Sequence, residues 1–281
     1  MRKNQITPIS RWFTSIGLYI WTILCIYPLV FAFFQSLKNN KQVYSGSAWD
    51  LPDFPLLWSN YVYTWENYNF SSYFVNSILV TIGSIFVSLL MASTTAYVLA
   101  RYRFRGSGLI FYMYLASMSI PTMMIIVPIF FLYGDLHLAN THSGLILLYA
   151  ISSLPLSLLL LIGFFKSLPH ELEESAVIDG ASHYGVFFRI MLPLAMPGLI
   201  TISIINILNY WNEFSYALIL MNDTRKYTLP IGLAYMQGEM QYRIEFGPLF
   251  AGLMISLVPM LVMYILFQNR INEGIVAGAV K

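Results

Sequence analysis

Residues 168–197 read LPHELEESAVIDGASHYGVFFRIMLPLAMP, a polar stretch between two long apolar runs. Four acids, Glu171, Glu173, Glu174 and Asp179, fall within nine residues of a chain in which only 10% of the residues are charged. Such a segment cannot lie in lipid, because unpaired charges are costly there. It must lie in water or against another protein, and we interpret it as a contact surface for a partner outside the membrane.

The composition predicts a membrane protein. Of 281 residues, 58% are hydrophobic, whereas a soluble domain has about 45–50% apolar and about 25% charged residues. The net charge of +2 gives no indication of a nucleic-acid partner. The single cysteine, Cys25, excludes a disulfide within the chain and a cysteine metal cluster. The first apolar run is too long for a signal-peptide core and is interpreted as a retained span.

Six apolar runs are long enough to cross the bilayer, which takes roughly 20 residues of helix. We predict spans at about 12–37, 74–99, 108–133, 143–165, 194–221 and 247–268. Helices satisfy their own backbone hydrogen bonds in lipid, so the expected fold is all-α with six transmembrane helices. With no sustained repeat and no low-complexity segment, residues 1–281 are expected to form a single membrane domain.

Lysine and arginine set the expected orientation, because they are enriched in cytoplasmic loops. An N-terminus in the cytoplasm gives ten basic residues to the inner segments and five to the outer ones. The inner ten are Arg2, Lys3, Arg11, Arg101, Arg103, Arg105, Lys166, Arg189, Arg270 and Lys281. Both termini and the loop 166–193 are therefore predicted to be cytoplasmic in a multi-pass protein of the cell membrane.

The polar stretch itself is predicted to be two short helices joined at Gly180. Leu172 and Ala176 share a helix face, and glycine accepts the left-handed conformation that ends a helix. A second helix over about 184–191 would end at Pro193. Amphipathic helices on the inner leaflet are usually rich in Lys and Arg, so the four acids favour a protein partner over a lipid surface.

The residues ESAVIDGAS and then FFRIMLPLAMP resemble the EAA loop of ABC import permeases. More narrowly, the chain resembles the carbohydrate-importer permeases related to the maltose permease subunit MalG, over nearly its whole length. WNEF at 211–214 and the C-terminal GIVAGAVK belong to the resemblance. Ser175 stands where the family usually has alanine. The matching positions are Glu174, Ala176, Asp179, Gly180, Ala181, Phe187, Ile190, Leu192, Pro193, Leu194 and Pro197.

This resemblance implies a type I ABC importer permease fold, with a coupling helix in the loop between helices 4 and 5. The coupling helix would lie in a cleft of a cytoplasmic ATPase and pass its movement to the membrane helices. The resemblance assigns the coupling role to Glu174, Ser175, Ala176, Asp179, Gly180, Ala181, Phe187 and Pro193.

The implied partners are two ABC ATPase subunits, a second permease subunit that is a different chain, and an extracytoplasmic solute-binding protein. ATP and Mg would be used by the ATPase subunits, because this chain has no G-x-x-x-x-G-K-[ST] loop. It would bind no cofactor and catalyse no reaction. The implied solute is a sugar or oligosaccharide, with an amino acid or a phosphorylated glycerol as the alternative.

Glu213 is the only formal charge deep in a predicted span. Intramembrane acids usually face a cavity or a partner, which makes it a candidate for the substrate pathway. Asn209, Trp211, Asn212 and Tyr216 lie beside it in sequence and could hydrogen-bond to a sugar ring or stack on it. The alternative is a polar contact between helices of the permease dimer.

The outer loop 222–245 offers Gln237, Glu239 and Tyr242 as candidate contacts to the binding protein, or it is a plain solvated loop. We expect no metal site, since Asp135, His137 and His142 lack a ligand spacing. A secondary transporter would need ion-coupling residues in several spans, and only Glu213 is present. An intramembrane enzyme would need a nucleophile–base pair or a motif such as H-E-x-x-H, and neither occurs.

Overall fold

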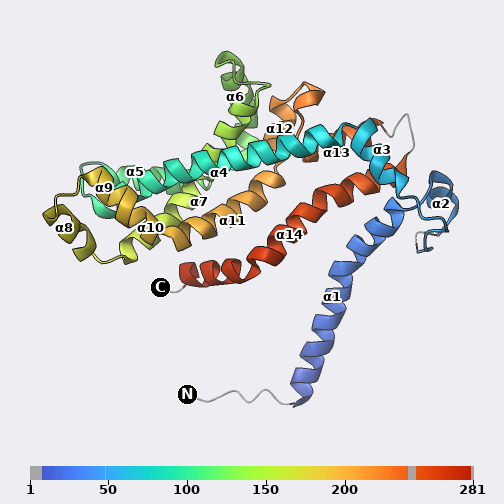
Figure 1. Ribbon diagram of the computed structural model, residues 1–281, viewed down its shortest axis with the longest axis horizontal. Coiled ribbons are helices and arrows are strands. Elements are labelled where there is room, and N and C mark those ends of the chain that lie inside the picture. The colour runs from blue at the N-terminus through green and yellow to red at the C-terminus, as the bar shows by residue number, and fades with distance from the viewer. Residues whose placement is uncertain (1–7, 48, 240–244, 280–281) are drawn as a thin grey trace. The chain divides into compact units, whose positions relative to one another are not determined.

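The computed structural model describes residues 8–47, 49–239 and 245–279, without the side chains of residues 8–11, 13 and 269–279. Throughout these ranges the regular structure is helical (Figure 1). The helices are α1 (Pro8–Ser36), α2 (Asn40–Ser45), α3 (Ser59–Asn67), α4 (Phe70–Arg101), α5 (Ser107–Ser117), α6 (Thr122–Asp135), α7 (His142–Ser167), α8 (Glu171–Ile178), α9 (His183–Val186), α10 (Leu192–Leu194), α11 (Met196–Trp211), α12 (Ser215–Leu220), α13 (Leu229–Glu239) and α14 (Phe246–Ala279).

Four of these helices contain uninterrupted segments long and apolar enough to cross a membrane: Thr14–Ser36, Phe70–Arg101, His142–Ser167 and Phe246–Gln268. Two bent pairs, α5 with α6 and the α9–α10 segment with α11, bring the number to as many as six. Where the sequence predicted spans at 74–99 and 143–165, α4 and α7 extend a few residues further at both ends.

The predicted span 108–133 is two helices in the structure, because α5 and α6 meet at an angle of 106°. The break falls at Pro121, which caps α6 in an extended conformation. Proline has no backbone N–H and disfavours the helical conformation of the residue before it. The last turn of α5 tightens ahead of the break, with the Ile120 N–H bonded to the Ser117 carbonyl.

The predicted span 194–221 is also interrupted. α11 ends at Trp211, and α12 begins at Ser215 after a short break. At its other end, α11 bends by 70° from the segment that precedes it. The second loop helix, predicted over 184–191, is α9 followed by a π-helical turn at Phe187–Met191. Pro193 cannot donate to the Arg189 carbonyl four residues back, which explains the widened turn.

The chain divides into two compact units. One comprises Met1–Phe70 with Leu233–Val258, and the other comprises Ser71–Gly232 with Pro259–Lys281. The expectation of a single membrane domain stays a prediction, since compact units need not be separate domains.

In the larger unit, α4, α7 and α11 lie side by side and share one core (Figure 1). Helices in lipid associate through close van der Waals packing, which small residues allow. α4 contributes Ala92 and Ala96, both fully buried, and α11 contributes Gly198. An added Cβ at Gly198 would lie 2.5 Å from Cδ2 of Phe164 on α7, so glycine is what permits this approach.

In the smaller unit, side chains of α3 join α1 to the start of α14. The Asn60 amide donates to the Ser36 and Lys38 carbonyls, and the Thr64 hydroxyl donates to the Pro248 carbonyl at 2.8 Å. The Tyr68 hydroxyl donates to Glu245 Oε2 at 2.8 Å. Burial, together with this hydrogen bond to a carboxylate, raises the pKa of Tyr68. These contacts fix the end of α1 against the first turn of α14.

The packing of α7 on α11 can be tested with a matched pair of glycines. Gly198→Ala gains about 1 kcal/mol of helix propensity but forces a ring displacement that costs about 1–3 kcal/mol. We expect a lower melting temperature in detergent. Gly163→Ala on α7 is the control, because an added Cβ there meets no heavy atom within 4 Å. Equal melting temperatures for the two variants would contradict the predicted close approach.

Candidate functional site

The acidic loop, defined as residues 166–193, has its predicted helix–glycine–helix form. Gly180 follows α8 with a φ of +82°, in the left-handed region. The Ala181 N–H donates to the Ala176 carbonyl, and the Gly180 N–H donates to the Val177 carbonyl. This Schellman motif closes α8. Ser182 then caps α9, accepting a hydrogen bond from the Gly185 N–H at 3.2 Å.

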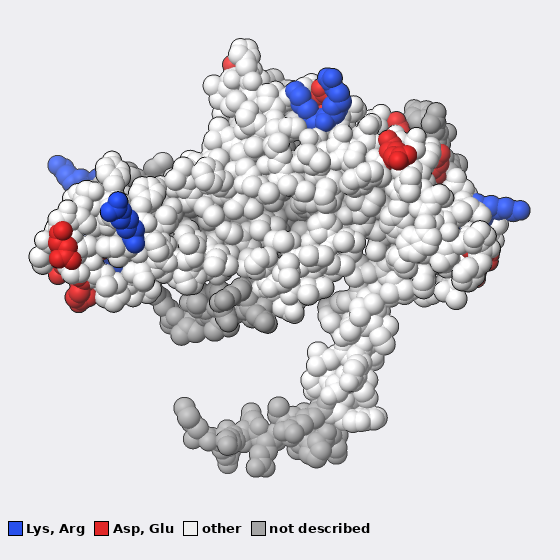
Figure 2. All heavy atoms as spheres, in the orientation of Figure 1, with Lys and Arg blue, Asp and Glu red and all other residues white. Residues whose placement is uncertain are grey.

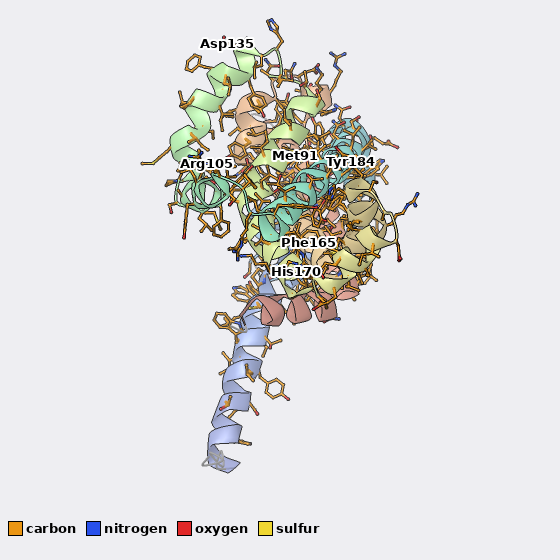
Figure 3. The ribbon with its side chains drawn as sticks, turned by 90° about the vertical axis from the view of Figure 1, so that its left-hand side faces the viewer. Met91, Arg105, Asp135, Phe165, His170 and Tyr184 are labelled. Carbon is orange, nitrogen blue, oxygen red and sulfur yellow. The ribbon has the colours of Figure 1, made fainter. Side chains whose placement is uncertain are left out.

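One face of the acidic loop is packed into the core of the larger unit. Ala176, Val186 and Phe187 are buried there. The Phe187 ring lies 5.0 Å from the ring of Tyr97 on α4, and Tyr97 also contacts Phe165 at the end of α7. Figure 3 looks at this end of the unit and labels Phe165, near the end of α7, and His170, just before α8. The loop is therefore seated on α4 and α7.

An ion pair fixes the loop further. Nε of Arg101, the last residue of α4, lies 3.1 Å from Glu173 Oε1, and the two side chains are 1% and 17% exposed. Arg101 also donates to the Leu168 carbonyl at 2.7 Å. Removing one partner of a buried pair typically costs about 3–5 kcal/mol. The sequence indicated Arg101 only as a marker of orientation, because nothing local shows which acid it meets.

The opposite face of the loop is exposed and carries both charge and apolar surface. Glu174, Ser175, Asp179 and Gly180 lie on it, and Figure 2 shows acidic side chains gathered over α8. Three apolar side chains lie among them: Val177, Ile178 and Tyr184 are 51%, 84% and 80% exposed. Of the remaining coupling candidates, Ala181 is half-buried and Pro193 is exposed in α10. We call the exposed residues of the segment 174–184 the outward face.

The structure places Glu213 in the break between α11 and α12. Its Oε1 accepts the Tyr216 N–H at 2.8 Å, and its Oε2 accepts the Ala217 N–H at 3.2 Å. Oε2 also accepts the Tyr149 hydroxyl of α7 at 2.6 Å. The carboxylate thus takes up free donors at the start of α12.

Glu213 is one end of a polar seam inside the larger unit. Asn206, 2% exposed, donates to Ser88 on α4 and Ser157 on α7, each at 3.3 Å. One turn further along α11, the Tyr210 hydroxyl bonds to Ser153 and its ring stacks 5.6 Å from Tyr149. Because side-chain hydrogen bonds between helices fix their register, the seam orients α11 against α4 and α7.

The other predicted pathway residues do not share one environment. Trp211 and Tyr216 are buried, and Trp211 packs edge-on against Phe74 of α4. Asn209 and Asn212 are exposed. The predicted substrate role of these five residues, Glu213 included, stays a prediction.

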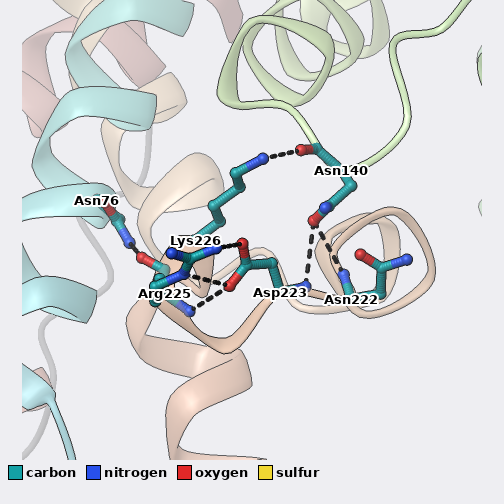
Figure 4. A network of polar contacts seen from close by, with 6 residues as sticks. All are labelled: Asn76, Asn140, Asn222, Asp223, Arg225 and Lys226. Carbon is teal, nitrogen blue, oxygen red and sulfur yellow. Dashed lines mark hydrogen bonds and ion pairs between the residues drawn. The ribbon is translucent and has the colours of Figure 1, made fainter.

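Beyond α12, a hydrogen-bonded network centres on Asn140 (Figure 4). Asn140 has a φ of +55°, and its side-chain oxygen accepts the Asn222 and Asp223 N–H groups. Its carbonyl accepts Lys226 Nζ at 2.7 Å. The hydrogen bonds from Arg225 lower the pKa of Asp223 to about 2. The loop 222–228 is thus tied to the loop before α7, a contact that the sequence did not reveal.

The candidate contacts to a binding protein lie elsewhere. Gln237 is exposed and Glu239 half-buried at the end of α13, and Tyr242 lies outside the described residues. Within the described part of the chain, no group of three His, Cys, Asp or Glu residues could hold a metal ion.

Comparison with known proteins identifies the family. The model for the binding-protein-dependent transport system inner membrane component matches residues 84–271, and the chain belongs to this family. It is 37% identical to the diacetylchitobiose uptake system permease protein NgcG of Streptomyces coelicolor, over 94% of this chain and 87% of that protein. It is 31% identical to the arabinooligosaccharides transport system permease protein AraQ of Halalkalibacterium halodurans, over 99% of each.

A solved structure shares the fold. It is the crystal structure of a bacterial ABC transporter involved in the import of the acidic polysaccharide alginate, one chain of which superposes with a TM-score of 0.82 at 22% identity. The match covers 96% of this chain and 99% of that one. The predicted family and the all-α importer-permease fold are confirmed, and the chain is a multi-pass membrane protein.

The position of Glu213 leads to a testable distinction. Both carboxylate oxygens of Glu213 accept backbone N–H groups. In Glu213→Gln, the side-chain NH2 group would face one of these N–H groups, so two donors would meet without an acceptor. An unsatisfied buried donor costs about 1–3 kcal/mol, and we expect a lower melting temperature. Asn212→Ala is the control, because the Asn212 amide, among the residues that the structure describes, bonds only to the Leu208 carbonyl of its own helix. An unchanged melting temperature with impaired transport would instead favour a substrate contact.

Proposed function

We propose that this chain is the permease subunit of an ATP-driven importer that takes up a sugar or oligosaccharide. The outward face of the acidic loop carries the proposal. Ile178 and Tyr184 expose most of their surface beside Glu174 and Asp179, on a loop whose other face is buried. An apolar patch rimmed by charge on a rigid support is typical of a protein contact.

The partner that fits this face is an ABC ATPase subunit, in whose cleft α8 would dock. The loop is held by Arg101, Phe187 and Ala176 rather than by flexible links, so a displacement of α8 is passed to the spans behind it. ATP and Mg would be used by two such subunits, and this chain would supply no catalytic group. The orientation follows, with the acidic loop and both termini in the cytoplasm.

The remaining partners are a second permease subunit and an extracytoplasmic solute-binding protein. The family description, a binding-protein-dependent transport system, supports the binding protein. Relatives that carry diacetylchitobiose and arabinooligosaccharides support a sugar or oligosaccharide as the solute. The binding protein would act on the extracytoplasmic side, and Gln237, Glu239 and Tyr242 of the predicted outer loop are the candidate contacts.

The docking of α8 can be tested with one exposed side chain. Ile178 is 84% exposed, so Ile178→Lys should leave the melting temperature unchanged. Buried against a partner, the same lysine would be an unpaired charge, and we expect the ATPase subunits to be lost on purification. Phe104→Lys is the control, because it adds the same charge at an exposed apolar side chain between α4 and α5, outside the outward face. Retention of the ATPase in Ile178→Lys would argue against this docking face.

Two other positions test coupling rather than docking. Gly180 has a positive φ and open space around it, so Gly180→Val strains the turn without a steric clash. Ala176 is buried, so a bulky residue there displaces α8 from the core. We expect both changes to leave the protein in the membrane while solute uptake falls relative to ATP hydrolysis. Normal transport by both variants would contradict the coupling role.

The substrate class is tested by purifying the complex from its native membrane. We expect an ABC ATPase and a second permease to co-purify, and ATP hydrolysis to rise when the binding protein is loaded with a sugar or oligosaccharide. Diacetylchitobiose, arabinooligosaccharides and alginate oligosaccharides are the first probes, with amino acids and glycerol phosphate as controls. Absence of an ATPase would overturn the importer, and stimulation by a control solute alone would overturn the sugar assignment.

A further inference from the structure

The guanidinium of Arg101 is where three elements of the larger unit meet. Arg101 ends α4, its Nη2 donates at 2.7 Å to the Leu168 carbonyl that follows α7, and its Nε faces Glu173 in the first turn of α8 at 3.1 Å. The arginine side chain is 1% exposed. A planar guanidinium has donors in a fixed fork, so it can hold a carbonyl and a carboxylate in one geometry.

The acids of the loop divide into two groups around this contact. Glu173 turns inward to Arg101, whereas Glu171, Glu174 and Asp179 are exposed and form no ion pair among the residues that the structure describes. The four acids of this polar stretch therefore differ in their contacts. One fixes the loop to the membrane helices, and three remain available to a partner.

The same end of α4 contacts the loop beyond the Gly180 turn as well. Tyr97 lies one turn before Arg101 on the same helix face and packs on Phe187 of the π turn at 5.0 Å. The Tyr102 hydroxyl lies 3.3 Å from His183 Nδ1 of α9. Both limbs of the loop, before and after Gly180, are thus joined to the end of α4, and Arg101 supplies the ionic contact.

We propose that Arg101 is a positioning residue that passes the movement of the acidic loop to α4 through its ion pair with Glu173. This inference rests on the proposed function, in which an ATPase moves the loop. Without the guanidinium, α8 would follow its covalent connection to α7, and the end of α4 would keep its contacts with the part of the loop beyond Gly180, Tyr97 with Phe187 and Tyr102 with His183. The role of Arg101 is to fix the geometry between α4 and α8.

The test separates a transmitting contact from a merely stabilising one. In a Cys25→Ser background, a reporter cysteine replaces Val75, which is 61% exposed in the second turn of α4. The rate of maleimide labelling is measured in the complex purified with its ATPase subunits, with and without the non-hydrolysable analogue AMP-PNP. The informative variant is Arg101→Met with Glu173→Leu, since apolar replacement of a buried pair is often neutral for stability.

We expect the double variant to keep its melting temperature and its ATPase subunits, while the nucleotide-dependent change in labelling falls about tenfold. Arg103→Ala is the matched control, because it removes the same charge from an exposed site two residues away. It should respond as the unsubstituted protein does. If the double variant does not reach the membrane, we compare Arg101→Lys with Arg103→Ala in the same assay. Lysine keeps the positive charge at position 101 but lacks the planar set of guanidinium donors.

The contrary outcomes are distinct. A full nucleotide response in the arginine variants would overturn the positioning role while leaving the importer intact. Loss of the ATPase subunits from those variants would also overturn it, because Arg101 would then only support the docking face. If the protein with Arg101 and Glu173 intact brings no ATPase or shows no nucleotide response, the proposed function itself fails.

Discussion

Lipid offers no hydrogen bonds, so polar groups within the spans must find partners in protein. This constraint explains features of the larger unit that look unrelated in sequence. At the break after α11, the Glu213 carboxylate accepts the Tyr216 and Ala217 N–H groups, which have no backbone acceptor at the start of α12. The buried Asn206 amide is placed between serines of two neighbouring helices for the same reason. The polar groups inside the bundle therefore help to set both the register of α11 and the start of α12.

At the end of the bundle the chain leaves the spans, and polar groups there need not all find partners within the protein. The acidic loop buries Ala176 and Phe187 and pairs one acid with Arg101, while leaving three acids and the Ile178 side chain uncovered. The packed inner face makes the loop rigid. The exposed acids and apolar side chains of the outward face leave it able to bind a partner protein. Transmission of movement needs both properties, because a flexible loop would absorb a displacement before it reached α4.

Much of this could be predicted from the chain. Runs without charge gave the positions of the long helices, and the glycine at 180 gave the turn that its positive φ now explains. The sequence did not show that the span expected over 108–133 is bent, because the strength of a proline kink depends on whether neighbouring elements stabilise the bent form; at Pro121 the bend reaches 106°. Glu213 was recognised as unusual, but its partner Tyr149 lies 64 residues away and leaves no local signal.

The sequence by itself determined that this is a helical membrane protein, which loop is polar, and to which family it belongs. Those properties follow from composition, periodicity and a local motif, each of which is read over a few neighbouring residues. Only the tertiary structure decided which acid is buried, which carboxylate caps a helix, and which helices the acidic loop is tied to. Arg101, Arg103 and Arg105 are alike in sequence, yet only Arg101 has Glu173 and the Leu168 carbonyl within reach among the described residues. Such pairings depend on how distant helices pack, and packing is a property of the whole bundle.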